Sequence, residues 1–228
     1  MEINTIVDWN NVTANLDTAD DETLYYAACY FDHGLIVENE ITVEVDKQKA
    51  FTLYERSANN EHIYAKVRLA DFYSEGQGCE QDIDYAIKLY LECVKGKSDI
   101  AALNLATVYR DRKNLDESFR YYQVAQELSI SPVIQLAHCY YYGLGTDVDR
   151  QKAYGIYKRV VDDADSTNNF QYDIDNACYH LGLYYLNGEI VVKSIEQARV
   201  YLELADKDND HGLANELLLM IGKSTQSI

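Results

Sequence analysis

Three stretches of the chain repeat one order of hydrophobic, small and polar residues. In each, a leucine is followed by alanine or glycine, then by a tyrosine, and further on by a capping residue and an alanine. The stretches begin at Leu69, Leu136 and Leu181, and in all three the tyrosine stands the same number of residues before the alanine. Apolar positions spaced by three and four residues are typical of amphipathic helices. Each copy therefore predicts two helices joined by a loop.

Two further copies depart from this order. The copy at Ala27 carries a longer internal segment, residues 35–45, which is β-prone and acidic. The copy at Leu105 is shorter and lacks a glycine pair. Together the five copies predict five helix pairs, with approximate spans 20–60, 61–97, 98–129, 130–170 and 174–207.

Glycines and capping residues mark the expected helix ends. The Gly-x-Gly pair that begins at Gly143 should end the first helix, because glycine readily adopts the left-handed cap conformation. An Asp or Ser four residues before the alanine, as at Asp82, suits the N-cap of the second helix. Ser131 and Pro132 are expected to be the N-cap and first residue of another helix.

This order of residues resembles the Sel-one-like repeat, a long-loop relative of the tetratricopeptide repeat, over roughly residues 20–206. The copy around Tyr109 is more similar to an ordinary tetratricopeptide repeat. The resemblance implies an all-α, right-handed α-solenoid of about five helix pairs that binds other proteins.

Both ends of the chain are expected to cover the array. Residues 1–19 form a predicted N-terminal cap anchored by Trp9, and residues 20–207 form the repeats. Residues 208–228 contain a predicted capping helix and a tail, and the whole chain is expected to be one continuous domain. The apolar face of the capping helix is predicted to consist of Leu213, Leu217, Leu218 and Ile221.

The charge balance restricts the partners. The 38 acidic residues outnumber the 20 basic ones, which gives a formal net charge of −18. Such a chain repels nucleic acid and anionic membranes and attracts basic proteins, although acidity also serves solubility alone. No secretory signal or membrane-spanning apolar run is apparent, and the five cysteines lack metal-ligand spacing. We therefore expect a cytoplasmic protein with free thiols that is monomeric when unbound.

Motifs for catalysis, cofactors or metals are weak. His138 and the adjacent Cys139 would point about 100° apart on a helix, so they do not form a nucleophilic pair. The Gly-x-Gly pairs lack the rest of a nucleotide-binding loop. Residues 206–210 begin like a calcium loop, but Leu217 stands where the bidentate glutamate belongs. The sequence predicts no enzyme, no cofactor and no metal.

Tyrosine is unusually frequent, with 21 copies. The repeat assigns some of them to the core, namely Tyr54, Tyr73, Tyr90, Tyr109, Tyr122, Tyr140, Tyr157 and Tyr185. The others need a different explanation. Tyrosine is enriched at binding hot spots, because it combines a large rigid surface with a polar tip.

In tetratricopeptide arrays the first helix of each pair lines the inner surface, and the resemblance carries this onto the present chain. The positions then predicted to bind a partner are Tyr25, Asp32, Asp71, Glu75 and Asp111 in the acidic N-terminal half, and His138, Tyr141, Tyr142, Tyr179 and Leu183 in the Tyr-rich C-terminal half. The acidic loop 162–175 adds Asp163 and Asp165. Packing of the tyrosines between repeats and a merely tolerated loop are the alternatives.

Two functions fit this sequence. An immunity protein would bind and occlude a cognate bacterial toxin, and such toxins are frequently basic nucleases. A scaffold or adaptor would instead hold signalling or envelope-associated proteins in its groove. The net charge of −18 ranks the immunity interpretation first by a small margin, because it favours a basic partner.

Overall fold

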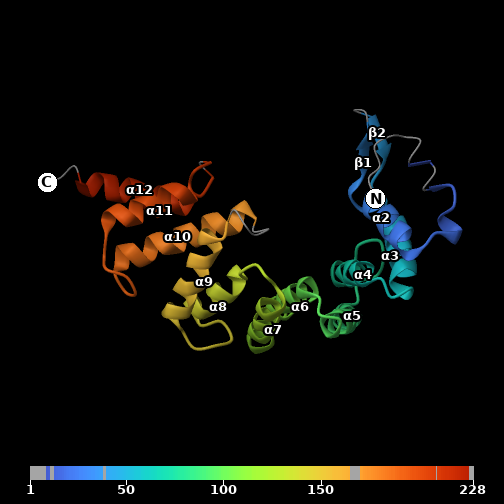
Figure 1. The fold of residues 1–228 in the computed structure, drawn as a ribbon, viewed down its shortest axis with the longest axis horizontal. Coiled ribbons are helices and arrows are strands. Elements are labelled where there is room, and N and C mark those ends of the chain that lie inside the picture. Colours follow the sequence, from blue (N-terminus) through green and yellow to red (C-terminus); the bar gives the residue numbers. More distant parts are fainter. Residues whose placement is uncertain (1–8, 11–12, 38–39, 165–169, 209, 226–228) are drawn as a thin grey trace. The chain divides into compact units, whose positions relative to one another are not determined.

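The computed structural model describes residues 9–10, 13–37, 40–164, 170–208 and 210–225, apart from the side chains of residues 37, 40–42 and 223–225. The chain divides into two compact units, Met1–Arg112 and Lys113–Ile228. Regular structure in the described residues is almost entirely helical (Figure 1), which confirms the predicted all-α fold of helix-pair repeats. The predicted boundaries of the N-terminal cap, the repeats and the C-terminal segment stay predictions.

The described residues of the N-terminal unit form two complete helix pairs, one further α-helix and a short 3₁₀ helix. A 3₁₀ helix, η1 (Leu16–Thr18), precedes the first pair, α2 (Asp21–His33) and α3 (Lys47–Asn59), and the strands β1 (Leu35–Val37) and β2 (Glu40–Val43) lie between these two helices in the sequence. The second pair is α4 (Ile63–Glu75) and α5 (Ile83–Lys95), followed by α6 (Asp99–Asp111). Each of these α-helices packs against the next one along the chain.

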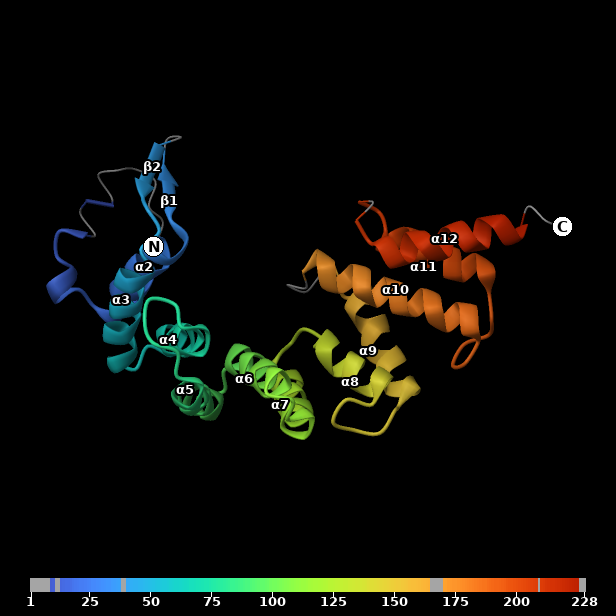
Figure 2. The same cartoon turned by 180° about the vertical axis from the view of Figure 1, so that it is seen from behind.

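The C-terminal unit continues the same arrangement. It contains α7 (Leu115–Leu128), the pair α8 (Ile134–Tyr142) and α9 (Arg150–Asp162), the pair α10 (Gln171–Asn187) and α11 (Ile195–Ala205), and the final α12 (Gly212–Thr225). Again each helix packs against the next, and Figure 2 shows α10, α11 and α12 lying on one another in that order.

One backbone hydrogen bond closes each long loop between the helices of a pair. The N–H of the N-cap residue donates to the carbonyl of the aromatic residue near the end of the first helix, at 2.8 to 3.0 Å, in the pairs Asp46 to Phe31, Asp82 to Tyr73, Asp149 to Tyr140 and Ser194 to Tyr185. Each of these N-cap side chains also accepts from the N–H three residues later, as Asp82 does from Tyr85 at 2.9 Å. The N-caps predicted for these four second helices are therefore confirmed.

The extra residues of the first copy form an antiparallel hairpin. Leu35 pairs with Val43, and Val37 pairs with Glu40. The bond from Asp46 to Phe31 is retained, so the hairpin is inserted between α2 and α3 without disturbing how the pair closes. The β-prone interpretation of residues 35–45 is confirmed.

The glycine pairs have two separate roles. The first glycine ends the helix in the left-handed conformation, as predicted; Gly143 has φ 73°. The second glycine lies against the beginning of a helix in the preceding repeat. A Cβ on Gly145 would stand 2.0 Å from the carbonyl oxygen of Leu115, and one on Gly78 would stand 2.3 Å from that of Lys47. Close approach of two backbones therefore requires the second glycine.

The predicted start of α8 is wrong. The helix begins at Ile134, and its N-cap is Val133 rather than Ser131. A side chain from α7 explains the difference, because the Oε1 of Gln126 accepts a hydrogen bond from the Val133 N–H at 2.8 Å. Gln126 thus satisfies a backbone donor that the sequence assigned to a serine cap.

The two ends of the described chain are packed. Trp9 is buried edge-to-face against Tyr30 and Phe31, with ring centroids 5.7 and 5.3 Å apart. At the other end, α12 packs on α11 through Ala214 and Ile221, as expected of a capping helix. The predicted face is confirmed for Leu217, Leu218 and Ile221, but Leu213 is exposed and Ala214 is buried instead.

The tyrosines assigned to the core divide into two groups. Those buried are Tyr54, Tyr90, Tyr122, Tyr140 and Tyr157, whereas Tyr73, Tyr109 and Tyr185 are partly exposed. The full burial expected of the second group is wrong. Two of these rings, Tyr73 and Tyr185, pack against an aromatic ring of the following helix, as Tyr185 stacks on Tyr201 at 5.6 Å.

Candidate protein-binding surface

Asp32 on α2 lies at the centre of a buried ionic cluster in the N-terminal unit. Its carboxylate accepts hydrogen bonds from Lys47 Nζ at 2.5 Å, Arg68 Nη2 at 2.5 Å and Tyr54 Oη at 3.1 Å. Burial alone would raise the pKa of Asp32, but the bonds from Lys47 and Arg68 hold it below its ordinary value. The side chain is fully buried, so the expected exposure of Asp32 on the inner surface is wrong.

Asp71 on α4 is the second internal acceptor of this unit. It accepts from Tyr90 Oη at 2.5 Å, Arg68 Nη1 at 2.8 Å and Asn104 Nδ2 at 2.9 Å. Burial raises the pKa of Asp71 above its ordinary value, and these three bonds oppose the rise. Only 13% of its side chain is exposed, so Asp71 too is mostly withdrawn from the surface on which it was predicted.

A group of aromatic and histidine side chains lies together in the C-terminal unit. This Tyr–His cluster consists of His138, Tyr141 and Tyr142 of α8, Arg150 and Tyr157 of α9, and Tyr179 and His180 of α10. His180 stacks on Tyr157 at 4.5 Å, and its ring centroid lies 5.2 Å from that of His138 and 4.9 Å from that of Tyr141. The predicted positions on α8 and α10, other than Leu183, are thus brought together.

The Tyr–His cluster opens to solvent on one side. Tyr142 is 56% exposed, and Tyr141 and Tyr179 are half-buried. Tyr157 and His180 are buried beneath them. The guanidinium of Arg150 lies 3.7 Å from the centroid of the Tyr141 ring, which is cation–π geometry. Large rigid rings over a fixed base are suited to contact with another protein.

His180 is held as a neutral ring. Its Nδ1 lies 2.9 Å from the carbonyl oxygen of Asn176, and since a carbonyl only accepts, Nδ1 carries the proton. The other nitrogen, Nε2, then accepts from Tyr142 Oη at 3.2 Å. Burial, with smaller contributions from His138, His211 and Arg150, lowers the pKa of His180 to about 4.

The lowered pKa of His180 predicts a pH dependence of stability. A depressed pKa contributes stability that is complete above the unfolded value near 6.5 and is lost as pH falls toward 4. Between pH 7 and pH 5 the free energy of unfolding should fall by about 2 kcal/mol from this group. Urea unfolding at both pH values should show a clearly smaller fall for His180→Gln. The exposed control His33→Gln should keep the fall of the parent, and an equal fall in the two variants would contradict this assignment.

Three polar atoms of the Tyr–His cluster are buried without a hydrogen-bond partner in the described part of the chain. They are His138 Nε2, Arg150 Nη1 and Tyr157 Oη. Burial lowers the pKa of His138, which favours its neutral form. Most buried polar atoms in folded proteins are paired, so three orphans in one cluster are unusual.

The tyrosine hydroxyls of the two units should differ in their effect on stability. Tyr90→Phe removes a hydrogen bond to a largely buried carboxylate and should lower the free energy of unfolding by about 2 kcal/mol. Tyr157→Phe removes an orphaned hydroxyl and should leave stability unchanged or raise it by up to ~1 kcal/mol. Urea unfolding followed by far-UV circular dichroism measures both. A comparable loss in the two variants would show that the Tyr157 hydroxyl has a partner.

The remaining predicted positions are dispersed. Tyr25 stacks on His62 at 4.7 Å in the N-terminal unit. Glu75 is exposed, and the exposed Asp111 pairs with the neighbouring Arg110 at 2.9 Å. Half-buried Leu183 lies on α10, Asp163 is the C-cap of α9, and Asp165 falls outside the described residues. Whether any of them contacts a partner stays a prediction.

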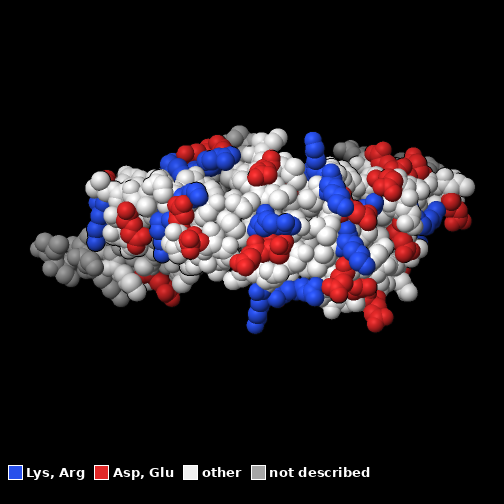
Figure 3. All heavy atoms as spheres, turned by 90° about the horizontal axis from the view of Figure 1, so that it is seen from below, with Lys and Arg blue, Asp and Glu red and all other residues white. Residues whose placement is uncertain are grey.

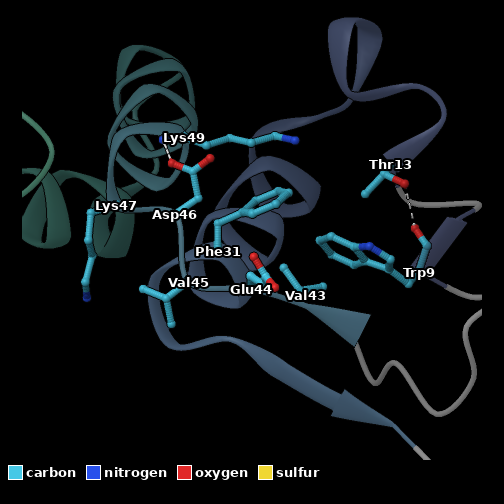
Figure 4. Close-up of a pocket in the computed structure, with 9 residues that line it drawn as sticks. All are labelled: Trp9, Thr13, Phe31, Val43, Glu44, Val45, Asp46, Lys47 and Lys49. Carbon is cyan, nitrogen blue, oxygen red and sulfur yellow. Dashed lines mark hydrogen bonds between the residues drawn. The ribbon is translucent and has the colours of Figure 1, made fainter. Parts of the chain in front are cut away.

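The N-terminal unit contains a pocket that was not predicted from the sequence. It measures about 600 Å³ and lies where α2 and the end of the hairpin meet the Trp9 segment (Figure 4). Trp9, Phe31 and Val43 form its apolar wall, and Lys49 Nζ lies 4.0 Å from the centroid of the Phe31 ring. The sequence analysis treated Trp9 as an anchor of the N-terminal cap and residues 35–45 as an insertion, and did not predict that the two would meet.

Charge on the surface is mixed. On the face drawn in Figure 3, basic side chains are interspersed among the acidic ones in both units. The described residues contain no group of three or more His, Cys, Asp or Glu side chains that could bind a metal ion. No described helix is both long and apolar enough to cross a membrane.

Five segments of the chain match the Sel1 repeat model: residues 22–62, 63–92, 100–128, 134–159 and 175–205. They cover more than half of the sequence and follow the helix pairs. The chain belongs to the Sel1 repeat family. Sel1 repeats are protein–protein interaction modules and are generally non-catalytic, so this Sel1 protein binds protein partners.

Solved Sel1 structures share the fold. A Sel1 repeat protein from Oxalobacter formigenes is 19% identical with a TM-score of 0.71, over 89% of this chain and 79% of its own. A protective antigen of uropathogenic Escherichia coli with an SLR fold is 16% identical with a TM-score of 0.58, over 93% of this chain and 50% of its own. A putative Sel1 repeat protein from Klebsiella pneumoniae is 19% identical with a TM-score of 0.52, over 93% and 98%.

Three residues of the Tyr–His cluster were missed from the sequence as site residues. Tyr157 was assigned to the core, and Arg150 and His180 were given no role. His180 directly precedes the repeat leucine Leu181, just as Arg68 directly precedes Leu69. The position before the repeat leucine could have identified His180 as a site residue. In both units the polar side chain at this position contacts the preceding repeat.

Proposed function

We propose that this Sel1 protein is a cytoplasmic bacterial immunity protein that binds and occludes a cognate basic toxin, such as a nuclease. The observation that carries the proposal is the Tyr–His cluster of the C-terminal unit, with exposed Tyr142 beside half-buried Tyr141 and Tyr179. Rings fixed on a rigid helical base lose little conformational entropy when a partner covers them. The toxin would be inhibited by coverage of its active face, without any catalysis by the immunity protein.

The net charge of −18 supports a basic partner, because it would accelerate the encounter and favour the complex at low ionic strength. Exposed acids such as Glu75 remain available for this role. Asp32 and Asp71 do not, since their charges are engaged inside the N-terminal unit.

A scaffold or adaptor role is the second candidate, and the same internal neutralisation favours it. With Asp32 and Asp71 withdrawn, binding would depend more on the aromatic rings than on charge. Such an adaptor should bind with an affinity that changes little with salt, whereas an immunity complex should weaken strongly as salt rises.

Co-expression with the toxin domain of a neighbouring gene tests the immunity proposal. The parent protein should restore growth and co-purify with the toxin, and Tyr142→Ala should weaken binding at least about tenfold. Tyr64→Ala is the matched control, because Tyr64 is 54% exposed against 56% for Tyr142 but lies in the N-terminal unit. A toxin that neither binds nor loses toxicity contradicts the immunity role. Equal weakening by both variants contradicts the location of the surface.

A further inference from the structure

Four residues around Asp32 in the N-terminal unit, counting Asp32 itself, have counterparts at the same repeat positions in the C-terminal unit. Asp32 stands two residues before the helix-ending Gly34, and Tyr141 stands two residues before Gly143. The same register relates Lys47 to Arg150, each directly after its N-cap. It also relates Tyr54 to Tyr157, and Arg68 to His180.

In the N-terminal unit these positions form a complete set of donors around an acceptor. Lys47, Arg68 and Tyr54 all direct hydrogen bonds to the carboxylate of Asp32. The cations and the hydroxyl are therefore satisfied by a group that the chain itself supplies.

In the C-terminal unit two of the three donors are kept and the acceptor is not. His180, at the position of Arg68, already donates to the Asn176 carbonyl. Arg150 replaces Lys47, Tyr157 retains the hydroxyl, and His138 adds a ring nitrogen from the position that Asp71 holds in the second repeat. Tyr141 takes the place of Asp32, and its ring supplies no carboxylate. Arg150 Nη1, Tyr157 Oη and His138 Nε2 are the three orphaned atoms described above.

We propose that the Tyr–His cluster binds a carboxylate of the partner protein, which accepts hydrogen bonds from the orphaned atoms as the Asp32 carboxylate does from Lys47, Arg68 and Tyr54 in the N-terminal unit. This inference rests on the proposed function and names the chemistry of the partner group that anchors there. The group is a single Asp or Glu side chain or a C-terminal carboxylate, and a partner that is basic overall still carries such groups. Arg150 supplies the charge, and Tyr157 and the Nε2–H tautomer of His138 supply neutral hydrogen bonds.

The surroundings of the cluster suit an anion. His138, His211 and Arg150 each lower the pKa of His180, whereas its bond to the Asn176 carbonyl raises it. Glu189 forms the described ion pair of Arg150, at 3.8 Å from Nε, and leaves Nη1 without a hydrogen-bond partner. Tyr142 is 56% exposed and the side chain of Arg150 is 34% exposed, and because the three orphaned atoms themselves are buried, these two side chains must move aside for a carboxylate to reach them.

Acetate is the smallest probe of this site, and acetamide is its neutral isostere. Titrated into the full-length protein at constant pH and ionic strength, acetate should shift the NMR signals of the His138 and His180 rings saturably, and acetamide should not. Bound acetate should also raise the pKa of His180 from about 4. Equal shifts with both probes, or none with acetate, would overturn the proposal.

Two sets of variants separate binding from folding. Tyr157→Phe removes a hydroxyl that has no internal partner, so it should weaken acetate binding about tenfold without loss of stability. Tyr141→Asp should supply the missing carboxylate and abolish acetate binding, whereas Tyr141→Asn should still bind acetate. Unchanged binding in Tyr157→Phe, or equal binding in the Asp and Asn variants, would contradict the proposal.

Peptides distinguish the two sources of carboxylate. Ac-Ala-Glu-Ala-NH₂ presents a side-chain carboxylate, Ac-Ala-Ala-Ala-OH presents a C-terminal one, and Ac-Ala-Gln-Ala-NH₂ presents neither. The proposal expects at least one of the first two to bind and the third not to bind. None of these measurements requires the toxin, so failure here leaves the immunity test intact. Conversely, acetate binding without any toxin complex would refute the immunity role alone.

Discussion

Replacement of Asp32 with asparagine is expected to lower the free energy of unfolding by about 3 kcal/mol. The carboxylate is fully buried and accepts hydrogen bonds from Lys47, Arg68 and Tyr54. An amide keeps the shape but leaves two cations facing a neutral group, and its NH₂ faces further donors. Lys47 and Arg68 are about one third exposed, so solvent relieves part of the loss, and the expected value lies at the lower end for a broken buried pair.

Trp9 makes this effect measurable in the unit concerned. It is the single tryptophan of the chain and packs against Phe31, which directly precedes Asp32. Urea unfolding followed by tryptophan fluorescence should therefore show the shifted midpoint. Asp111→Asn is the matched control, because Asp111 is exposed and pairs with its exposed neighbour Arg110. The control should change stability by less than ~0.5 kcal/mol. A similar effect in both variants would mean that the Asp32 cluster contributes little to stability.

The helix pairs could be predicted because their signals are local. Apolar spacing, an N-cap such as Asp82 and a helix-ending glycine such as Gly143 act within a few residues, and all of them reappear in the structure. The start of α8 could not be predicted in this way, because Gln126 of another helix satisfies the donor of Val133. That contact depends on how the two helices pack, and the spacing of apolar residues gives no information on this packing.

The candidate site was predictable in position but not in chemistry. The repeat register correctly grouped His138, Tyr141, Tyr142 and Tyr179, since residues at one register face one side of a repeat. The same register placed Asp32 at the surface, but its side chain is fully buried. A residue's exposure depends on what the next repeat presents to it, and Arg68 from that repeat covers Asp32. Pairs across adjacent repeats, rather than single positions, decide which polar groups remain available.

The second glycine of a pair shows the same dependence on a neighbouring repeat, and Gly145→Ala should have an effect as large as that of Asp32→Asn. Gly145 has φ 69°, where alanine is strained by about 1 kcal/mol. The added Cβ would also stand 2.0 Å from the carbonyl oxygen of Leu115, which is backbone and cannot rotate away. The loop must move off the start of α7, so we expect a total loss of about 3 kcal/mol or more.

Gly155→Ala provides a control of the opposite sign within the same unit. Gly155 is exposed in the interior of α9, and a Cβ there meets nothing within 4 Å. Alanine should raise stability by about 0.5–1 kcal/mol, because it restricts the unfolded chain and favours the helix. Thermal and urea unfolding followed by far-UV circular dichroism would compare the two. If Gly145→Ala were as stable as Gly155→Ala, the loop would not depend on its approach to Leu115, and the second glycine would serve only the turn. If the stability changes of Gly145→Ala and Gly155→Ala differ in sign as expected, the second glycine of the Gly-x-Gly pair is required for a contact between successive repeats.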